Sequence, residues 1–259
     1  MVVPAGGAQA PVRLEVRDGI GHVVLARPAA SNAVDLRTAH ALRDAVAAAA
    51  ADDAVGAVLV TGEGKRFCAG GDVASMLAVE DRAAHLEELA GAVDEALVAL
   101  HRMEKPVVAA VQGAVAGAGL AVMLSCDLVV AETSTRFVSA YAGVGLTPDC
   151  GLSWLLPRAV GQQRALELLL TPRVLTADEA HAWGLVTEVA ADGTAGGRAA
   201  EIAGRLAAGP AYALGQARRL VRTGGDTDRA AVGRDEARTI ARAVATPAAT
   251  ALLDRFGRR

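Results

Sequence analysis

Two short glycine-rich stretches, about fifty residues apart, constrain the fold of this chain more than any other feature. The first is Phe67–Asp72 and the second is Gln112–Gly119. Each follows an apolar run typical of a buried β-strand, Ala57–Val60 in one case and Val107–Val111 in the other. Each also precedes a segment with helical character. The pattern therefore predicts two strand–turn–helix units of similar construction.

Glycine in these two turns lets the backbone bend sharply and lets a ligand approach the main chain closely. The first N–H groups of the helix that follows have no intrahelical partner, and the helix dipole favours negative charge there. If the two turns converge, their N–H groups form an oxyanion hole, which stabilises an enolate or a tetrahedral anion. For either stretch taken alone, ordinary turn and packing glycine is the alternative.

The overall composition indicates a globular protein without a nucleic-acid-binding surface. Apolar residues make up 53% of the 259 residues, enough for a sizeable core in one large domain or one domain with an appendage. Aromatic residues make up only 3%, which disfavours a base-stacking platform, and a net charge of −3 disfavours an electrostatic footprint for nucleic acid. We therefore expect no nucleic-acid partner.

The cysteines and histidines show no metal-binding pattern. Cys68, Cys126 and Cys150 have no CxxC spacing, and the five histidines form no HExxH cluster, so we expect free thiols in a reducing compartment and no metal. Residues 1–11 lack the features of a signal peptide, and the longest apolar run, Gly113–Leu124, is too short to span a bilayer. These observations predict a cytoplasmic protein without membrane contact.

The order of the remaining patterns predicts strand–helix units followed by helices. The turn Asp18-Gly19 joins two apolar runs as a β-hairpin. Residues 35–50 are expected to form a helix capped by Asp35, and residues 82–102 a longer helix with apolar residues at helical spacing. A polar, glycine-rich linker is expected at Asp192–Gly197, with only helices after it. A coiled repeat and a doubly wound sheet remain alternatives at this point.

At these motifs the sequence resembles the enoyl-CoA hydratase/isomerase (crotonase) superfamily. The matching pieces stand in the order and spacing of that family and cover nearly all of residues 12–190. Gly145–Arg158 is most similar to the phenylacetate-pathway ring-epoxide/oxepin-CoA isomerases, and dienoyl-CoA isomerases also place a catalytic aspartate at the position of Asp149. The matching pieces are Arg27–Ala33, Gly62–Asp72, Lys105–Asp127, Gly145–Gly161 and Leu175–Val189.

The resemblance implies an α/β fold, namely a spiral of repeated ββα units with a C-terminal helical oligomerisation region. The implied organisation is a disordered or extended N-terminus at 1–11, a spiral core with the acyl-CoA site at 12–192, and the helical region at 193–259. A homotrimer or a dimer of trimers is implied as well. The implied substrate is an acyl-CoA thioester, so coenzyme A is part of the substrate and no separate cofactor is expected.

Taken position by position, the resemblance assigns the two oxyanion donors to the main-chain N–H groups of Gly71 and Ala118. Ala118 stands where the family usually has glycine, but the donor is the main chain, so a methyl group need not remove it. The resemblance also places Arg27, Ala29 and Ala69 beside the pantetheine and adenine of CoA.

Two further positions in the implied substrate-binding region have alternative interpretations. Asp72 follows the oxyanion glycine, and N-capping of the next helix is the interpretation we favour. Tyr141 either lines the acyl pocket, where it can hydrogen-bond a substrate, or is a packing residue.

The acid–base groups differ from those of the family's hydratases, which place two glutamates at the site. The corresponding positions here hold Ala121 and Tyr141. Alanine has no proton to exchange, and a tyrosine with an ordinary pKa near 10 is a poor base at neutral pH. Asp149 is the one carboxylate expected where the substrate should lie. Its alternative role is to cap the helix that begins near Cys150.

A lone carboxylate suits a 1,3-proton shift through a dienolate held in the oxyanion hole, and Leu146, Leu152 and Trp154 are expected to desolvate it. The hypothesis is therefore an acyl-CoA isomerase of fatty acid or phenylacetate metabolism. It would shift a C=C double bond or isomerise a ring-epoxide aryl-acetyl-CoA, with Asp149 as the proton shuttle. The alternatives are an enoyl-CoA hydratase or thioesterase of the same fold, and a catalytically silent acyl-CoA-binding subunit.

Overall fold

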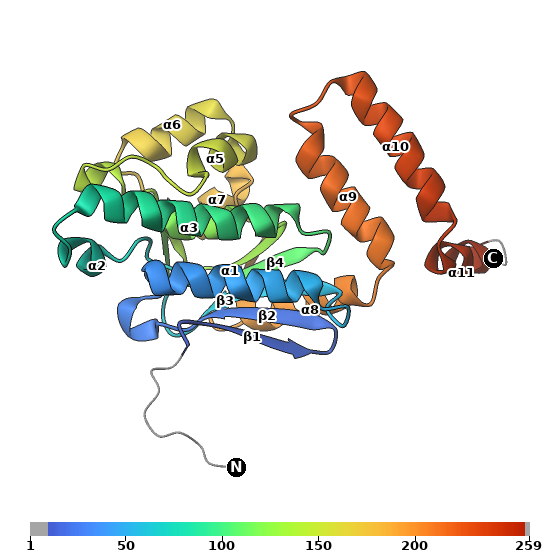
Figure 1. Ribbon diagram of the computed structural model, residues 1–259, viewed down its shortest axis with the longest axis horizontal. Helices are drawn as coiled ribbons and strands as arrows, with labels where there is room; N and C mark the ends of the chain where they lie inside the picture. Colours follow the sequence, from blue (N-terminus) through green and yellow to red (C-terminus); the bar gives the residue numbers. More distant parts are fainter. Residues whose placement is uncertain (1–9, 257–259) are drawn as a thin grey trace, which may run out of the picture.

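The computed structural model describes residues 10–256, so most of the predicted N-terminal extension at 1–11 lies outside the described part. A six-stranded sheet forms its centre (Figure 1). The first pair of strands is antiparallel, as the Asp18-Gly19 turn predicts, and the other neighbours in this sheet are parallel. Across the sheet the strands are β1 (Val12–Arg17), β2 (Ile20–Leu25), β3 (Ala57–Gly62), β4 (Val107–Val111), β6 (Leu128–Glu132) and β9 (Glu188–Ala190).

A second, three-stranded sheet consists of β5 (Ala114–Ala116), β7 (Arg136–Val138) and β8 (Leu175–Thr176). The chain passes from β4 into β5 through Gly113, which has a φ of 62°. A Cβ atom at Gly113 would lie 2.0 Å from the carbonyl oxygen of Lys65, so no larger residue fits this step. The close approach places β5 beside the first glycine stretch, where Cys68 and Val115 form a parallel bridge.

Helices cover both faces of the six-stranded sheet (Figure 1). The helices α1 (Leu36–Ala51) and α3 (Arg82–Arg102) pack against each other on one face, and α8 (Ala195–Ala207) covers the other. Because successive side chains of a strand point to opposite faces, β3 serves both layers. Val58 and Val60 join the core under α1 and α3, whereas Leu59 packs with α8.

The long helices begin where their capping residues predict. The Asp35 carboxylate accepts a hydrogen bond from the Thr38 N–H at the start of α1, and the Asp81 carboxylate does the same for Ala84 in α3. The observed bounds of α3 match the predicted range 82–102. The remaining helices before α8 are α2 (Val73–Leu77), α4 (Ala118–Leu124), α5 (Leu152–Val160), α6 (Gln162–Leu170) and α7 (Ala177–Trp183), with short 3-10 turns at Pro28–Ala30 and Ala142–Val144.

The predicted linker at Asp192–Gly197 is wrong in its second half, because α8 already begins at Ala195. Gly196 and Gly197 lie in its first turn, where an added Cβ would meet no other atom within 4 Å. The small side chains of Ala199 and Ala203 let the helix lie closely on the sheet, and both are fully buried. The helix α8 therefore packs on the six-stranded sheet.

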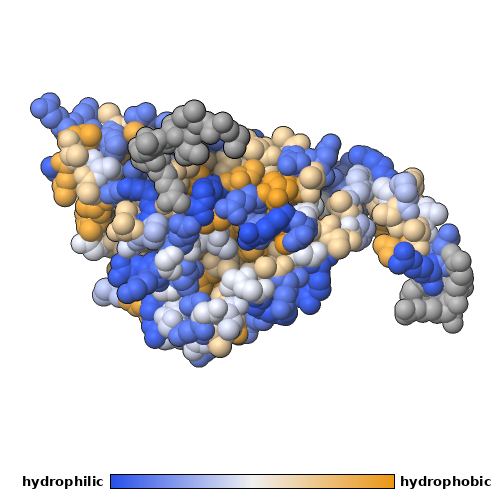
Figure 2. All heavy atoms as spheres, turned by 90° about the horizontal axis from the view of Figure 1, so that it is seen from below, coloured by the Kyte–Doolittle hydropathy of each residue, from blue (hydrophilic) through white to orange (hydrophobic). Residues whose placement is uncertain are grey.

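The last three helices form an arm that projects from the body (Figures 1 and 2). They are α9 (Ala211–Gly224), α10 (Arg229–Val244) and α11 (Pro247–Phe256). Large apolar side chains are exposed along the arm, including Val221 at 81% and Ile240 at 70% of their surface. The predicted role of this region in oligomerisation stays a prediction.

No three or more His, Cys, Asp or Glu side chains within residues 10–256 are grouped so that they could hold a metal ion. None of the helices in the same range combines the length and apolar character that crossing a bilayer requires.

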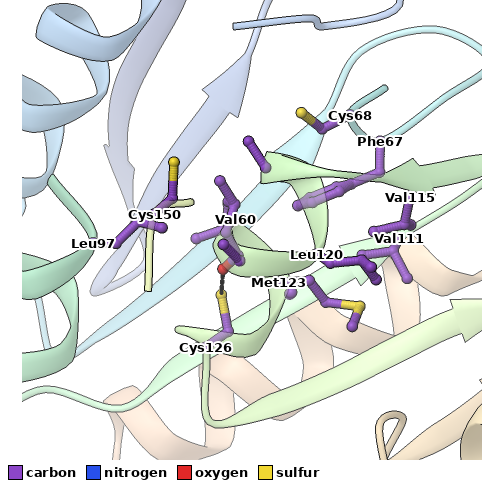
Figure 3. Close-up of a cluster of buried hydrophobic side chains, with 14 of the residues drawn as sticks. Val60, Phe67, Cys68, Leu97, Val111, Val115, Leu120, Met123, Cys126 and Cys150 are labelled. Carbon is purple, nitrogen blue, oxygen red and sulfur yellow. Dashed lines mark hydrogen bonds between the residues drawn. The ribbon is translucent and has the colours of Figure 1, made fainter. Parts of the chain in front are cut away.

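A buried apolar cluster connects the two glycine stretches (Figure 3). Phe67 and Cys68 come from the first stretch, while Val115, Leu120 and Met123 come from the second stretch and from α4, and all five are fully buried. This shared core fixes the two turns relative to each other, so the site described next rests on a tightly packed base.

Candidate active site

The two glycine turns converge, as the oxyanion-hole hypothesis requires. Gly70 has a φ of 100° and Gly117 a φ of 51°, conformations that favour glycine. A Cβ atom at Gly117 would lie 3.5 Å from the Cα of Gly70, and one at Gly119 would lie 2.5 Å from the Cys68 carbonyl oxygen. The absence of side chains is therefore what lets the two segments of main chain meet.

The backbone pairing between Gly71 and Val34 leaves the Gly71 N–H pointing away from the segment that contains Val34. In the bridge with Val34, the Val34 N–H donates to the Gly70 carbonyl at 2.8 Å, and the Asp72 N–H donates to the Val34 carbonyl at 2.9 Å. Both bonds use the groups on either side of Gly71. The N–H of Gly71 itself has no acceptor within the described chain.

Ala118 is the first residue of α4, and Gly117 is its N-cap. A helix leaves the N–H groups of its first turn without intrahelical acceptors, and that of Ala118 has no other acceptor within residues 10–256. Its methyl group is only 4% exposed and packs into the core. The alanine in place of the family's usual glycine thus keeps its donor.

Gly71 and Ala118 both line a cavity of about 310 Å³, which we call the first cavity. Ala69, Tyr141 and Asp149 line it as well. The structure therefore brings together five of the eight residues that the sequence analysis proposed for the site.

The carboxylate of Asp149 is held by Tyr141 and does not act as a helix cap. The Tyr141 hydroxyl donates to Asp149 Oδ1 at 2.6 Å. The N-cap of α5 is Gly151, with a φ of 73°, and no side chain caps this helix. Asp149 contributes only its main-chain carbonyl to the helix start, where it accepts from the Leu152 N–H. The capping alternative is thereby corrected, and the carboxylate is available to the first cavity.

Two residues with positive φ stand at the ends of the segment that carries Tyr141 and Asp149. Ala140 has a φ of 62° and Cys150 a φ of 51°. A residue with a side chain adopts this region at a cost, so its surroundings must hold it there. Such conformations are concentrated at functional sites, and here they bracket the hydrogen-bonded pair.

Burial and the nearby negative charge keep the neighbours of Asp149 protonated. Burial, reinforced by the Asp149 carboxylate, raises the pKa of the Tyr141 hydroxyl far above its ordinary value, so this group remains a hydrogen-bond donor. The same causes raise the pKa of the Cys150 thiol. Burial also raises the pKa of Cys68 to about 11, so neither cysteine is a thiolate nucleophile at neutral pH.

The apolar residues expected around Asp149 divide among three places. Leu146 lines the first cavity, as expected. Leu152 is fully buried in the core below it. Trp154 faces a separate cavity on the far side of Cys150. The sequence order placed them near Asp149, but Leu146 lies before α5, and within that helix Leu152 and Trp154 face different sides.

Three residues carried over as substrate contacts lie outside the first cavity. The Arg27 guanidinium contacts Asp72 Oδ2 at 2.9 Å and Asp35 Oδ2 at 3.2 Å. Asp72 also accepts from the Ala74 and Ser75 N–H groups, which confirms the N-cap interpretation. Ala29 is exposed on the Pro28–Ala30 turn. A role of these residues near CoA stays a prediction.

One carboxylate in the first cavity was missed by the sequence analysis. Glu87 lines it from α3, together with Leu86 and Ala90. Its side chain is exposed, and nothing in its sequence context sets it apart from the other acidic residues of that helix. Only the packing of α3 beside the segment that carries Tyr141 and Asp149 reveals it.

The comparisons with known proteins identify the family of the chain. The family model described as enoyl-CoA hydratase/isomerase matches residues 15–247. The chain is 35% identical to a 1,2-epoxyphenylacetyl-CoA isomerase from Escherichia coli, over 77% of each protein. It is also 35% identical to a 4-chlorobenzoyl coenzyme A dehalogenase from an Arthrobacter species, over 82% of this chain and 78% of the relative.

Solved structures give the same assignment. The crystal structure of an enoyl-CoA hydratase from Polaromonas superposes with a TM-score of 0.90 at 30% identity, covering 96% of this chain and 97% of that one. The residues matched by the family model, 15–247, include both glycine turns and the Tyr141–Asp149 pair. The chain therefore belongs to the enoyl-CoA hydratase/isomerase family.

Proposed function

We propose that the protein is an acyl-CoA isomerase that moves a C=C double bond by a 1,3-proton shift. Its substrate would be an unsaturated acyl-CoA of fatty acid or phenylacetate metabolism. Asp149 would be the proton shuttle, and the N–H groups of Gly71 and Ala118 would hold the anionic intermediate. Isomerisation of a ring-epoxide aryl-acetyl-CoA is a separate reaction that the proposal also includes, because the Escherichia coli relative is named for the isomerisation of 1,2-epoxyphenylacetyl-CoA.

The observation that carries the proposal is the position of the Asp149 carboxylate. It lines the cavity that contains both free N–H donors, and it is not used as a helix cap. The carboxylate accepts the Tyr141 hydroxyl at Oδ1, and the adjacent Cys150 thiol also hydrogen-bonds to it. A general base needs a carboxylate oxygen within reach of the substrate proton.

The proposed reaction conserves all atoms. With the thioester oxygen accepting the two N–H groups, the Asp149 carboxylate removes a proton from the carbon next to the thioester carbonyl. The electron pair of that C–H bond moves into the conjugated dienolate, whose negative charge lies on the thioester oxygen. The same carboxyl group returns the proton to the γ-carbon, and the double bond moves into conjugation. Loss of one oxyanion-hole donor in comparable sites costs about 2.7–4 kcal/mol.

The residues at the two positions that hold acid–base glutamates in the family's hydratases support isomerisation. Ala121 is fully buried in the core and does not line the first cavity. Tyr141, at the other such position, is bound to Asp149 and is a poor base because its pKa is raised. The pair of carboxylates at those two positions is thus missing.

The test is Asp149→Asn, which keeps the size of the side chain and an acceptor for Tyr141. We expect turnover of 3-enoyl-CoA substrates to fall about 10²–10⁴-fold, the range for loss of general acid–base catalysis. Exchange of α- and γ-hydrogens of the substrate in deuterated water should fall in parallel. Near-normal turnover would remove Asp149 from the mechanism, and an unchanged unfolding midpoint would show that the variant is folded.

Hydration is the second candidate, and Glu87 is the observation that favours it. This carboxylate lines the first cavity from α3, so a second acid or base faces the same space as Asp149. Product mass separates the two reactions, because hydration adds water and isomerisation does not. If hydrated product accumulates and Glu87→Gln abolishes it, the isomerase proposal is wrong.

The remaining expectations belong to the same proposal. Coenzyme A would enter as part of the substrate, without a separate cofactor. A homotrimer or a dimer of trimers, with the arm α9–α11 in the contacts, would be the working assembly, and the protein would act in the cytoplasm. The relatives support the acyl-CoA part, because their names include coenzyme A thioesters.

A further inference from the structure

The guanidinium group of Arg27 connects a nearby segment of chain to Asp72, which is 45 positions away in the sequence. It donates to the Ala33 carbonyl at 2.5 Å and contacts Asp35 Oδ2 at 3.2 Å and Asp72 Oδ2 at 2.9 Å. The Arg27 side chain is 24% exposed, so these partners enclose most of it. The proposed reaction assigns no task to this cluster.

The main chain of Val34 lies at the centre of the cluster and determines the direction of the Gly71 N–H. The Val34 N–H donates to the Gly70 carbonyl, and the Asp72 N–H donates to the Val34 carbonyl. The peptide bond between Gly70 and Gly71 is trans, so its carbonyl and its N–H point in opposite directions. Because Val34 binds the carbonyl, the N–H is directed away from Val34.

Arg27 contacts the residues on both sides of Val34. Ala33 precedes Val34 in the chain and Asp35 follows it, while the third partner, Asp72, directly follows Gly71. One side chain therefore ties the segment Ala33–Asp35 to the end of the glycine turn. A shift of either segment would rotate the peptide group that carries the Gly71 N–H.

The chain just before Val34 has a backbone conformation that its surroundings must maintain. Ser31 has a φ of 56° and Asn32 a φ of 55°, a region that residues with a side chain adopt at a cost. Asn32 is only 1% exposed, and its side chain accepts from the Arg27 N–H at 2.8 Å and donates to two main-chain carbonyls. The main chain of Arg27 is thus fixed where its side chain begins.

Each carboxylate of the cluster divides its two oxygen atoms between a helix and Arg27. Oδ1 of Asp72 accepts from two N–H groups at the start of α2, and Oδ2 contacts Arg27. Oδ1 of Asp35 accepts from the Thr38 N–H at the start of α1, and Oδ2 contacts Arg27. The capping bonds hold both carboxylates in the orientation in which Arg27 can bind them.

We propose that Arg27 is a positioning residue for the oxyanion hole, because it holds the Gly71 N–H in place by tying Ala33–Asp35 to Asp72. This inference rests on the proposed function, in which that N–H accepts the charge of the thioester oxygen. A donor stabilises the developing charge only at about 2.7–3.1 Å from the oxyanion, so a small displacement matters. Arg27 acts through the main chain and does not touch the substrate.

The charges of the cluster favour this role over a contact with a CoA phosphate. One guanidinium faces two carboxylates, Asp35 and Asp72, so the cluster has a net negative charge. Like charges repel, and the phosphates of CoA are negative. The resemblance places Arg27 beside the pantetheine and adenine of CoA, and the two roles predict different measurements.

Two variants break the tie in different ways. Asp72→Asn keeps the cap of α2, because asparagine caps a helix as well as aspartate, but it places an NH₂ group opposite Arg27. Arg27→Met keeps an unbranched side chain without its donors. In each we expect kcat with 3-enoyl-CoA substrates to fall about 10–100-fold, since a displacement of about 1 Å can cost about 10²-fold. The dissociation constant of hexanoyl-CoA, which lacks the reacting double bond, should stay within about threefold.

A matched control is Arg198→Met. Arg198 also binds two carboxylates, those of Glu188 and Glu201, but it does not line the first cavity. Its kcat should stay within about twofold of the natural value, as for a surface ion pair. An equal loss of kcat in Arg27→Met and Arg198→Met would contradict a specific role of Arg27.

The thioester carbonyl gives a readout that a merely structural role would not change. Hexanoyl-CoA labelled with ¹³C at this carbonyl would be bound to each protein and measured by infrared difference spectroscopy. Two N–H donors should lower its stretching frequency in the natural protein and in Arg198→Met. Displacing one donor should remove roughly half of that shift in Arg27→Met and Asp72→Asn, as loss of the other donor should in Ala118→Pro. A full shift in both cluster variants would overturn the inference.

A truncated substrate separates positioning from a contact with CoA. The 3-hexenoyl thioester of N-acetylcysteamine lacks the adenine nucleotide and most of the pantetheine. If Arg27 acts on the Gly71 N–H, Arg27→Met should lower kcat/KM by the same factor with this thioester and with the CoA thioester. A loss confined to the CoA thioester, mainly in KM, would show that Arg27 contacts CoA and would overturn the inference.

Combining the variants tests whether the two residues share one task. If they do, kcat of Arg27→Met/Asp72→Asn should lie within about threefold of that of Arg27→Met, whereas independent effects would multiply and contradict the tie. Arg27→Lys keeps the charge but cannot contact all three acceptors, so its kcat should lie between those of Arg27→Met and the natural protein. With Asp72→Asn, it provides the test if Arg27→Met does not fold.

The outcomes also separate this inference from the proposed function. If the natural protein does not lower the carbonyl frequency, the oxyanion hole and the role of Arg27 are both wrong. A lowered frequency that persists in Arg27→Met and Asp72→Asn refutes the role of Arg27 alone. A reduced shift in those variants, together with full activity of Asp149→Asn, would refute the proton shuttle and support the role of Arg27.

Discussion

The wall of the first cavity that contains Gly71 and Ala118 is made of main chain, whereas the wall that contains Tyr141 and Asp149 is made of side chains. We call them the glycine wall and the side-chain wall. The glycine wall is fixed by close backbone approach over a shared apolar core. The side-chain wall is a segment bounded by two residues with positive φ and joined by one hydrogen bond.

This difference separates two tasks within one site. Main-chain donors cannot be exchanged by ordinary substitutions, so the glycine wall supplies a constant feature, the stabilisation of a thioester oxyanion. The side-chain wall determines which proton moves, because a single substitution can add or remove an acid there. A family built in this way can change its reaction while keeping its fold and its thioester.

The strongest test of the glycine wall is Ala118→Pro. Proline is tolerated at the first position of a helix, yet it has no N–H to donate. We expect kcat to fall about 10²–10³-fold, as for other lost oxyanion donors, with little change in the unfolding midpoint. Ala118→Gly is the control, because it keeps the donor, and its kcat should stay within threefold. Full activity of the proline variant would mean that this N–H does not hold the oxyanion.

The packing of the glycine wall is tested by Gly119→Ala. The added methyl would lie 2.5 Å from the main-chain oxygen of Cys68, a contact that requires movement of the backbone. We expect a loss of about 1–3 kcal/mol in the free energy of unfolding, measured by denaturant titration. Gly143→Ala, next to the side-chain wall, meets no atom within 4 Å and should change stability by less than about 0.5 kcal/mol. Equal losses of unfolding free energy in the two variants would contradict the difference in packing between the two walls.

The side-chain wall is tested by Tyr141→Phe. This change removes the donor to Asp149 and keeps the ring, so we expect kcat to fall about tenfold with a stability loss of about 1 kcal/mol. Steady-state kinetics and thermal unfolding would measure the two effects. A variant with unchanged kcat would show that the hydrogen bond only supports the local structure.

The smallest expected effect is on the pH dependence of stability. It comes from His101, which does not line the first cavity. Its pKa is about 4 in the folded protein and about 6.5 in the unfolded chain, so the unfolded state binds more protons between these values. Stability therefore falls as the pH is lowered from 6.5 towards 4 and is fully present above 6.5. Because the ring is partly exposed, we discount the contribution to about 1 kcal/mol.

The variant His101→Asn isolates this contribution, since the amide oxygen can still accept from Arg222 but does not titrate. Between pH 6.5 and 4.5 the variant should lose less stability than the natural protein. Parallel pH curves for the two proteins would show that protonation of His101 is not linked to folding.

The elements with strong local signals were predictable from the sequence. The helix at 82–102 has a capping aspartate, regular apolar spacing and a proline shortly after its end, and all three act within a few residues of the chain. The convergence of the glycine stretches was also correct. The physical reason is visible only in the structure, where β3 and β4 are parallel neighbours and carry the turns that follow them to the same edge.

What the sequence could not provide were the contacts between distant faces. The exposed Glu87 lines the first cavity only because α3 packs beside the segment with Asp149. Trp154 faces a separate cavity because of the direction in which α5 starts. Arg27 has two carboxylate partners from other parts of the chain, which its sequence neighbourhood does not indicate. The extent of α8 was missed because glycine composition cannot tell a linker from an exposed helix turn.

The three buried cysteines can report how often the native core opens. Cys68, Cys126 and Cys150 are all buried, and desolvation raises the pKa of Cys126 to about 12, so an alkylating reagent meets almost no thiolate while the chain is closed. The rate of modification at each sulfur would therefore report how often that part of the molecule opens. Since Cys150 separates two hollow regions and the other two do not, it should be modified first, and a bound thioester should slow that reaction.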